Sequence, residues 1–255
     1  MMIFIRAVVI VLLMLTTSWS ALGTGVKVEI LTDDDYPPYS YVLNGETKGI
    51  YIDLVKKAAK YLQPEYDVTV VAMPWKRALK ELEMGHGFAV LPPYLHTELR
   101  PYIHPYSVPI ATEQVVTFCR RGIELEKAFT PSLKLPNPIS IGLNSGYLIL
   151  TDKYHDAVHN ENLIVLENKS TEANIIKLLK GRVDCYVNDE LSTEYSLALI
   201  KNGTAGLPGI DIEKMDVLSS QTVHIGYTQV NEANFPYKND FVSKMDKALQ
   251  KVIKK

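Results

Sequence analysis

Hydrophobic residues follow two periods that alternate along the first part of the chain. Apolar residues at every second position predict a strand at 26–30, and the β-branched apolar run at 68–73 is typical of a buried parallel strand. Between these strands, apolar residues at helical spacing predict an amphipathic helix over 50–62. A second helix is expected over 74–85, from a proline to a glycine, before a strand at 87–91.

The same order of elements returns later in the chain. The elements are expected at 139–143, 163–166, 175–181 and 183–187. The segment LEMGHGFAVL (82–91) aligns with LLKGRVDCYV (178–187), and both are predicted to pass from a helix through a glycine into a strand. The chain therefore contains two βαβαβ halves.

Two such halves predict an α/β fold with two βαβαβ lobes, since parallel strands need crossover helices on the sheet faces. Segments 113–119 and 223–227 fit neither half, so we expect them to be strands that cross between the lobes. The tail from Phe241 has one apolar face and predicts a closing helix. We expect lobe 1 to contain 24–111 and 229–255, lobe 2 to contain 112–228, and a ligand cleft to lie between them.

The first 23 residues have the three-part layout of a secretory signal peptide. A short start ends at the positive Arg6, an apolar run occupies 7–15, and small residues follow from Ser18 to Gly23. The apolar run is far shorter than the ~20 residues that span a bilayer, which argues against an uncleaved anchor helix. We therefore expect residues 1–23 to be removed and the mature protein to be periplasmic and soluble.

Composition and charge narrow the possible classes of function. The 255 residues are 47% hydrophobic and 22% charged, as in folded proteins rather than disordered chains. The net charge of −2 argues against nucleic-acid binding, which usually needs a concentrated basic face. Enzymes and small-molecule binders remain.

Polar and aromatic residues cluster where the predicted strands end. In open parallel sheets, ligands bind beyond the carboxyl ends of the strands, here at 33–41, 74–77, 92–100, 144–147 and 188–190. Aromatic rings desolvate a ligand, an Arg side chain can bind a carboxylate with two hydrogen bonds, and an Asp side chain accepts from an ammonium group. These segments favour a small polar ligand that carries both charges. The expected contacts are Asp33, Tyr36, Trp75, Tyr94, Arg100, Tyr147 and Asp189, with Arg77 as an additional candidate.

Several short motifs follow one another between Val26 and Ile253. They are Asp33-x-x-Tyr36-x-Pro38-Tyr39, Gly49-Ile50-x-x-Asp53-Leu54, TELR at 97–100, GLNSG at 142–146, and Gly181-x-Val183-Asp184 followed by Asp189. Each motif alone is common. Their order and spacing together resemble the type II periplasmic solute-binding proteins of the amino-acid-binding class, family 3, which serve ABC importers.

This resemblance implies roles for individual residues. The aromatic residues that match Tyr36 and Trp75 enclose the ligand side chain. The Arg that matches Arg100 holds the ligand carboxylate, and the Asp that matches Asp189 receives the α-amine. Three other roles stay open: an ion pair of Arg100 with Glu98, a helix N-cap for Asp189, and core packing for the two aromatic residues.

The resemblance also implies a receptor that is not an enzyme. Such a receptor captures a small zwitterionic ligand and delivers it to an inner-membrane ABC permease, and we expect it to be a monomer that uses no cofactor. Two alternatives remain open. One is a dehydratase-like enzyme on the same scaffold, with an acid such as Glu190 in the cleft, and the other is a soluble ligand sensor for a membrane signalling protein.

The chain also departs from the family's pattern. Residues 92–94 (Pro-Pro-Tyr) stand where small hydroxyl residues usually precede the Arg segment, and Tyr147 and Leu148 replace a common Ser/Thr pair. The neutral hydrogen bonds of an amino-acid site are therefore changed, which leaves the ligand's identity open.

Metal and cysteine chemistry have little support in the sequence. His155 and His159 are four residues apart but do not complete an HExxH motif, so we expect no metal site. Cys119 and Cys185 are the only cysteines. An exported protein can oxidise them, but the sequence does not fix the distance between them, so their pairing stays open.

Overall fold

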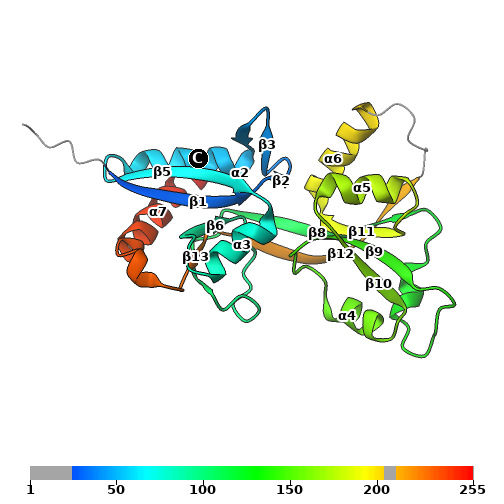
Figure 1. Cartoon of the computed structure of the whole chain (residues 1–255). Coiled ribbons are helices and arrows are strands. Elements are labelled where there is room, and N and C mark those ends of the chain that lie inside the picture. Colours follow the sequence, from blue (N-terminus) through cyan, green and yellow to red (C-terminus); the bar gives the residue numbers. More distant parts are fainter. Residues whose placement is uncertain (1–24, 204–210, 255) are drawn as a thin grey trace, which may run out of the picture.

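The protein consists of two lobes, each built on a five-stranded sheet (Figure 1). The computed structural model describes residues 25–203 and 211–254. The predicted signal peptide, 1–23, lies outside these residues. No helix within the described ranges is both long and apolar enough to cross a membrane. The predicted α/β fold with two lobes is confirmed.

The first lobe follows the predicted order of strands and helices. Its sheet has the order β5-β1-β6-β13-β7, and β1 pairs in parallel with both β5 and β6. Helices α2 and α7 share the hydrophobic core on one face of this sheet, and α3 packs on the other face. The bounds are β1 Val26–Asp33, α2 Ile50–Ala59 with a 3₁₀ turn Lys60–Leu62, β5 Tyr66–Met73, α3 Trp75–Glu83, β6 Ala89–Leu91, β7 Ile103–Tyr106, β13 Gly226–Thr228, a 3₁₀ turn Glu232–Asn234, and α7 Lys238–Ile253.

The second lobe repeats the parallel part of this arrangement. Its sheet has the order β10-β9-β11-β8-β12, in which β9 pairs in parallel with β10 and β11. Helix α4 packs on one face and α5 on the other. The bounds are β8 Ala111–Arg120, a 3₁₀ turn Leu125–Phe129, β9 Ile139–Asn144, α4 Asp152–His159, β10 Leu163–Asn168, α5 Thr171–Leu179, β11 Cys185–Asp189, α6 Glu190–Gly203 and β12 Ile212–Val223.

Two long strands connect the lobes. β8 and β12 pair antiparallel within the second sheet, and Figure 1 shows both extending towards the first lobe. The chain leaves β12 at Val223 and enters the first sheet at Gly226. The segment expected to cross at 113–119 lies in β8, whereas 223–227 joins β12 to β13. The lobe boundaries expected at 111/112 and 228/229 stay predictions.

The helix–glycine–strand junctions that aligned in the sequence have the same conformation in both lobes. Gly85 after α3 has a φ of 70°, and Gly181 after α5 has a φ of 65°. Each glycine N–H donates to the carbonyl three residues earlier, on Leu82 and Leu178. This left-handed conformation favours glycine, because a side chain would be strained there.

A small three-stranded sheet, which the periodicity did not predict, precedes α2. Its strands are β2 Asp35–Tyr36, β3 Ser40–Leu43 and β4 Glu46–Lys48. Gly49 follows with a φ of 131°, and a Cβ at this position would lie 2.1 Å from the Tyr39 carbonyl oxygen. The close approach lets the Tyr51 N–H donate to that oxygen at 3.0 Å, and the two tyrosine rings stack with centroids 4.6 Å apart. Gly49 therefore brings two aromatic side chains together.

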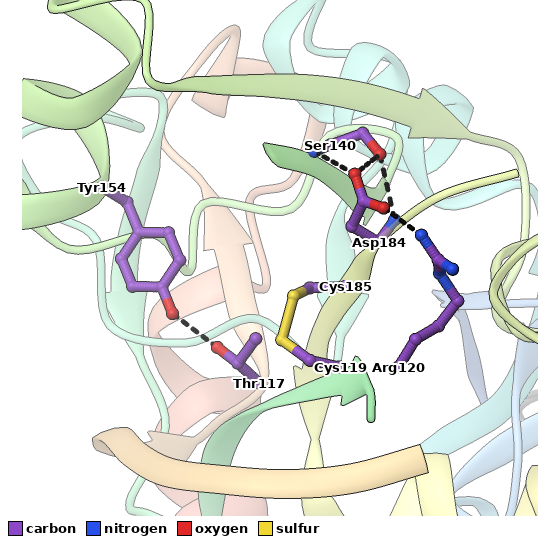
Figure 2. The surroundings of a disulfide bond; sticks show 7 residues. All are labelled: Thr117, Cys119, Arg120, Ser140, Tyr154, Asp184 and Cys185. Atoms are coloured by element: carbon purple, nitrogen blue, oxygen red, sulfur yellow. Dashed lines mark hydrogen bonds and ion pairs between the residues drawn. A yellow bond between two sulfur atoms is a disulfide. The ribbon is translucent and has the colours of Figure 1, made fainter. Parts of the chain in front are cut away.

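A disulfide bond joins the central strands of the second lobe. Cys119 on β8 lies directly opposite Cys185 on β11, and the two residues form a disulfide (Figure 2). The neighbouring residues Arg120 and Asp184 form an ion pair, and Asp184 also accepts from the Ser140 hydroxyl at 2.6 Å. The pairing that the sequence left open is therefore present.

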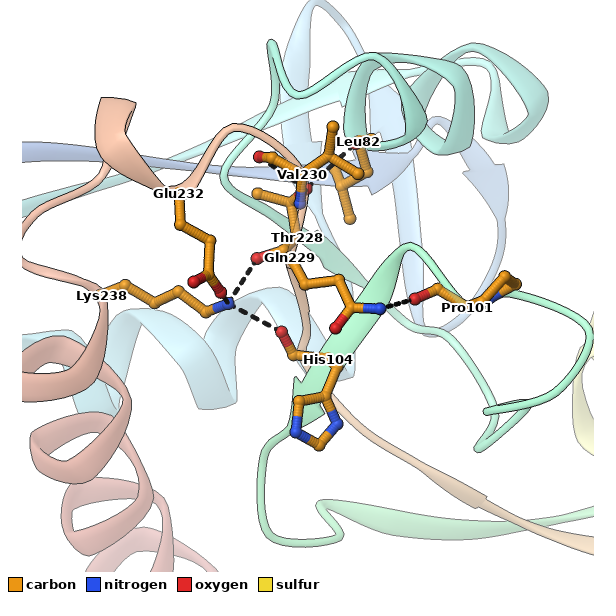
Figure 3. A network of polar contacts seen from close by, with 8 residues as sticks. All are labelled: Leu82, Pro101, His104, Thr228, Gln229, Val230, Glu232 and Lys238. Carbon is orange, nitrogen blue, oxygen red and sulfur yellow. Dashed lines mark hydrogen bonds and ion pairs between the residues drawn. The ribbon is translucent and has the colours of Figure 1, made fainter.

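A buried lysine connects three elements of the first lobe. Lys238, at the start of α7, is only 6% exposed. Figure 3 shows its ammonium group donating to the carbonyl oxygens of His104 and Thr228, at 2.8 and 2.6 Å, beside the carboxylate of Glu232. These bonds tie α7 to β7 and β13.

Candidate functional site

A cavity lies between the two lobes, beyond the ends of β1, β6 and β9. It brings together the expected contacts of both lobes except Asp189. Its first-lobe residues are Asp33, Tyr36, Trp75, Pro92, Tyr94, His96 and Arg100, and its second-lobe residues are Tyr147, Leu148 and Ile149. The carboxyl ends of the strands therefore converge as the sequence predicted.

The cavity is small because side chains from both lobes close it. Its volume is about 30 Å³, against roughly 300–1,000 Å³ for typical ligand pockets. The Tyr147 hydroxyl donates to Asp33 Oδ2 at 2.9 Å across the cleft, and Arg100 Nη2 donates to the Gly146 carbonyl oxygen at 2.7 Å. A ligand of amino-acid size can enter only when the lobes part or these side chains turn.

Arg100 provides the positive charge at one end of the cavity. Its guanidinium carbon lies 5.6 Å from the centroid of the Trp75 ring, and the residue is only 4% exposed. Pro74 starts α3, which places Trp75 in the first turn of that helix. Burial lowers the pKa of Arg100, but guanidinium groups stay protonated in proteins. Among the described residues Arg100 forms no ion pair with Glu98.

Asp33 lies at the end of β1, where it accepts from Tyr147 and from the backbone N–H of Asp35 at 3.1 Å. Burial raises the pKa of this carboxyl group to about 7, although both hydrogen bonds act in the opposite direction. His96 directly precedes the TELR motif and also lines the cavity. Burial and the nearby charge of Arg100 lower the pKa of its imidazole to about 4. His96 is therefore neutral at physiological pH.

Glu113 is a second buried carboxylate, directly behind the cavity lining, and it was not among the residues predicted for the site. Its Oε2 accepts from the hydroxyls of Tyr36 and Tyr94, and its Oε1 accepts from Tyr51 at 2.5 Å. Burial, followed by the charge of Asp189, raises the pKa of Glu113 to about 7, and the three tyrosine hydrogen bonds oppose this shift. The sequence pattern could have indicated this residue, since the alternation of side chains along a strand places Glu113 on the buried face of β8.

Asp189 does not line the cavity. Its Oδ1 accepts from the Tyr39 hydroxyl at 3.0 Å and from the backbone N–H of Ser192 at 2.8 Å. The second bond caps the start of α6, so Asp189 has the N-cap role that the sequence left open. Burial raises its pKa. Asp189 is connected to the site through Tyr39, whose ring centroid lies 5.1 Å from that of the cavity-lining Tyr36.

Arg77 lies outside the cavity. Its side chain is 68% exposed and its Nε is 3.8 Å from Glu81 on the same helix. Within the described part of the chain, no group of three or more His, Cys, Asp or Glu side chains could hold a metal ion.

Comparisons with known proteins connect this arrangement to a family. The profile of the bacterial extracellular solute-binding proteins, family 3, matches residues 28–255. The chain belongs to this family. The resemblance inferred from the motifs is therefore confirmed. No curated protein sequence matches this family 3 chain.

Solved structures agree with the family 3 fold. An ancestral arginine-binding protein bound to arginine has a TM-score of 0.69 at 20% identity, over 91% of this chain and 94% of that one. The arginine-, lysine-, histidine-binding protein ArtJ from Geobacillus stearothermophilus has a TM-score of 0.66 at 18% identity, over 89% and 90%. A histidine kinase sensor domain with similarity to periplasmic binding proteins has a TM-score of 0.70 at 14% identity, over 91% and 92%. At these identities the likeness concerns the fold.

Proposed function

We propose that this family 3 protein captures a small, polar, amino-acid-like ligand in the cavity between its lobes and delivers it to an inner-membrane ABC importer. In this proposal residues 1–23 direct export and are removed, and the mature protein acts in the periplasm as a monomer and not as an enzyme. The observation that carries the proposal is the cavity itself, which is lined by the guanidinium of Arg100 and the carboxyl group of Asp33, with Glu113 buried behind Tyr36 and Tyr94.

The ligand's carboxylate would take the place of the Gly146 carbonyl oxygen at Arg100. A guanidinium group binds a carboxylate through two parallel hydrogen bonds, whereas a backbone carbonyl takes only one or two weaker ones. The Trp75 ring beneath the guanidinium would shield this pair from water. Arg100 therefore gains more from a ligand than from its present partner.

The ligand's amine would be received on the carboxylate side of the cavity. Asp189 has this role in the proposal, which requires the Tyr39 hydroxyl to release its Oδ1. Arg100 lies in the first lobe and Asp189 in the second, so one zwitterion contacts both lobes only when the cleft is closed. This difference in contact is what shifts the equilibrium between open and closed forms.

Calorimetry with an arginine variant tests the proposal. Charge-assisted hydrogen bonds contribute about 1.5–3 kcal/mol. Arg100→Ala should therefore weaken amino-acid binding roughly tenfold to over a hundredfold. Arg77→Ala is the matched control, because it removes an exposed guanidinium from the neighbouring helix and should leave affinity unchanged. The ligand is first found by thermal shift against amino acids, opines, polyamines and organic acids.

Two outcomes would contradict this function. Equal binding by the wild-type and Arg100→Ala proteins would make Arg100 a structural residue. A new product in the calorimeter cell, detected by mass spectrometry, would favour the dehydratase-like alternative.

A sensor role is the second candidate, and one structural neighbour favours it. The histidine kinase sensor domain has the same fold over most of both chains. In a strain that lacks this protein, lost uptake of the labelled ligand supports the transport role. Normal uptake with a lost transcriptional response to the ligand would support the sensor.

A further inference from the structure

The hydroxyl groups around the cavity all point their protons away from it. A tyrosine hydroxyl has one proton to donate and two lone pairs that accept. Tyr36 and Tyr94 line the cavity, and each donates its proton to Glu113. Tyr147 also lines the cavity and donates its proton to Asp33. These three hydroxyl oxygens can therefore only accept hydrogen bonds from a ligand.

The cavity consequently has one donor end and one acceptor end. Arg100 is the donor end, since a guanidinium group has five N–H donors and no acceptor. Asp33 adds its carboxylate to the three hydroxyl oxygens at the acceptor end. A neutral amide side chain offers one donor group and one acceptor group, so its carbonyl oxygen would meet only acceptors there. An ammonium or guanidinium group offers donors alone.

Glu113 fixes the direction of two of these three hydroxyls. It is 2% exposed, and its three hydrogen bonds all come from tyrosine hydroxyls of the first lobe. Once it is ionised, above its pKa of about 7, the Glu113 carboxylate accepts only, so every hydroxyl that contacts it must donate. Aromatic rings around a cation add further attraction through their π faces.

We propose that Glu113 orients Tyr36 and Tyr94 so that the inner end of the cavity accepts hydrogen bonds only, and thereby selects ligands with a second cationic group. The ligand class is an amino acid with a basic side chain, which has one carboxylate for Arg100 and two cationic donors. Glu113 is a positioning residue, because it acts through the two tyrosines. This inference rests on the proposed function of the cavity.

The test compares L-lysine and L-arginine with L-glutamine at pH 8, where Glu113 is mostly ionised, by calorimetry on the wild-type protein and on Glu113→Gln. The wild-type protein should bind the basic amino acids at least tenfold more tightly than glutamine. Glutamine at position 113 keeps the shape of the side chain, but its amide nitrogen donates to one tyrosine and turns that hydroxyl proton towards the cavity. The preference for a basic side chain should then fall about tenfold, chiefly through weaker lysine and arginine binding.

Asp189→Asn is the matched control. It removes a neighbouring buried carboxylate whose hydrogen bonds come from Tyr39 and Ser192 rather than from Tyr36 or Tyr94, so it should weaken lysine and glutamine alike. Tyr94→Phe provides a second route if Glu113→Gln does not fold. It deletes one acceptor oxygen at the half-buried rim and should lower the preference several-fold.

The outcomes separate this inference from the proposed function. Binding of lysine and glutamine with equal affinity, or equal losses for both in Glu113→Gln, would overturn the inference and leave the proposed function standing. An unchanged preference in Tyr94→Phe would also overturn it. A wild-type protein that binds no amino acid of the series would overturn both.

Discussion

The two lobes share a scaffold but contribute opposite hydrogen-bonding groups to the cleft. Each has three parallel strands in the same order and the same glycine junction. Yet the first lobe mostly donates across the cleft and the second mostly accepts. The bonds run from Tyr36, Tyr51 and Tyr94 to Glu113, from Tyr39 to Asp189, and from Arg100 to the Gly146 carbonyl, while Tyr147 to Asp33 runs the other way.

Most of this difference arises outside the repeated elements. The donors of the first lobe lie in the small sheet, the start of α2 and the segment between β6 and β7. The repeated strands and helices stabilise each lobe. The segments that connect them mainly decide whether the lobe donates or accepts hydrogen bonds across the cleft. The scaffold and the cleft can therefore be tested separately.

The largest expected effect concerns the second lobe alone. Replacing both cysteines, Cys119→Ala with Cys185→Ala, removes a crosslink between residues 66 positions apart. Such a loss destabilises a protein by about 2–4 kcal/mol, or roughly 5–15 °C of melting temperature for a chain of this size. Hydrogen exchange should show faster opening in β8 and β11 with little change in β1 and β5. Equal acceleration in both lobes would contradict their separate stability.

A smaller effect is expected in the first lobe when Lys238 is changed. Lys238→Met keeps the length of the side chain but leaves the carbonyl oxygens of His104 and Thr228 without their donor. Each unpaired buried group costs about 1–3 kcal/mol, but the variant no longer buries a charged ammonium group, and the desolvation cost saved in this way offsets much of the loss. Lys247→Met on the exposed side of the same helix is the control and should have almost no effect. Chemical denaturation measures both variants, and equal stabilities would refute the role of this ammonium group.

The smallest effect concerns the cleft and depends on pH. Asp33 and Glu113 both have a pKa of about 7 because they are buried, against ordinary values of 3.8 and 4.5. The closed form thus binds more protons than a hydrated open form between about pH 4 and pH 7. Linkage then makes closure without ligand less favourable as the pH rises through this range.

Small-angle scattering of the protein without ligand measures this shift. The radius of gyration should be smaller at pH 5 than at pH 8. An Asp33→Asn, Glu113→Gln double variant should lose most of the pH dependence, with the remainder due to Asp189, whose pKa burial also raises. A more open protein at pH 5 would reverse the predicted sign.

Much of the fold followed from local patterns. Strand and helix periods predicted the parallel strands, α2, α3, α5 and α7, and the ends of these strands indicated Asp33, Arg100 and Tyr147 as neighbours. The small three-stranded sheet was not predicted, because its strands are too short to show a pattern of alternation. The disulfide depends on the register of β8 against β11, which is a long-range property that no local pattern contains.

The site was predicted less completely, for physical reasons. Glu113 lies in segment 113–119, which was predicted only as a strand that connects the lobes. Its buried position on β8 was therefore not included in the predicted site. Asp189 is the last residue of its strand, as Asp33 is, but the start of α6 competes for its carboxylate. Strand ends therefore predict which residues approach the cleft, while hydrogen-bond competition decides which of them face a ligand.

A crystal structure of the wild-type protein with L-lysine tests the central claim most directly, namely that the cavity has a donor end and an acceptor end. The lysine carboxylate should lie within hydrogen-bond distance of Arg100 in place of the Gly146 carbonyl oxygen. Its side-chain ammonium should lie between the hydroxyls of Tyr36 and Tyr94, with Glu113 behind them. Lysine bound in the reverse direction, bound outside this cavity, or bound while Arg100 still contacts Gly146 would contradict the account.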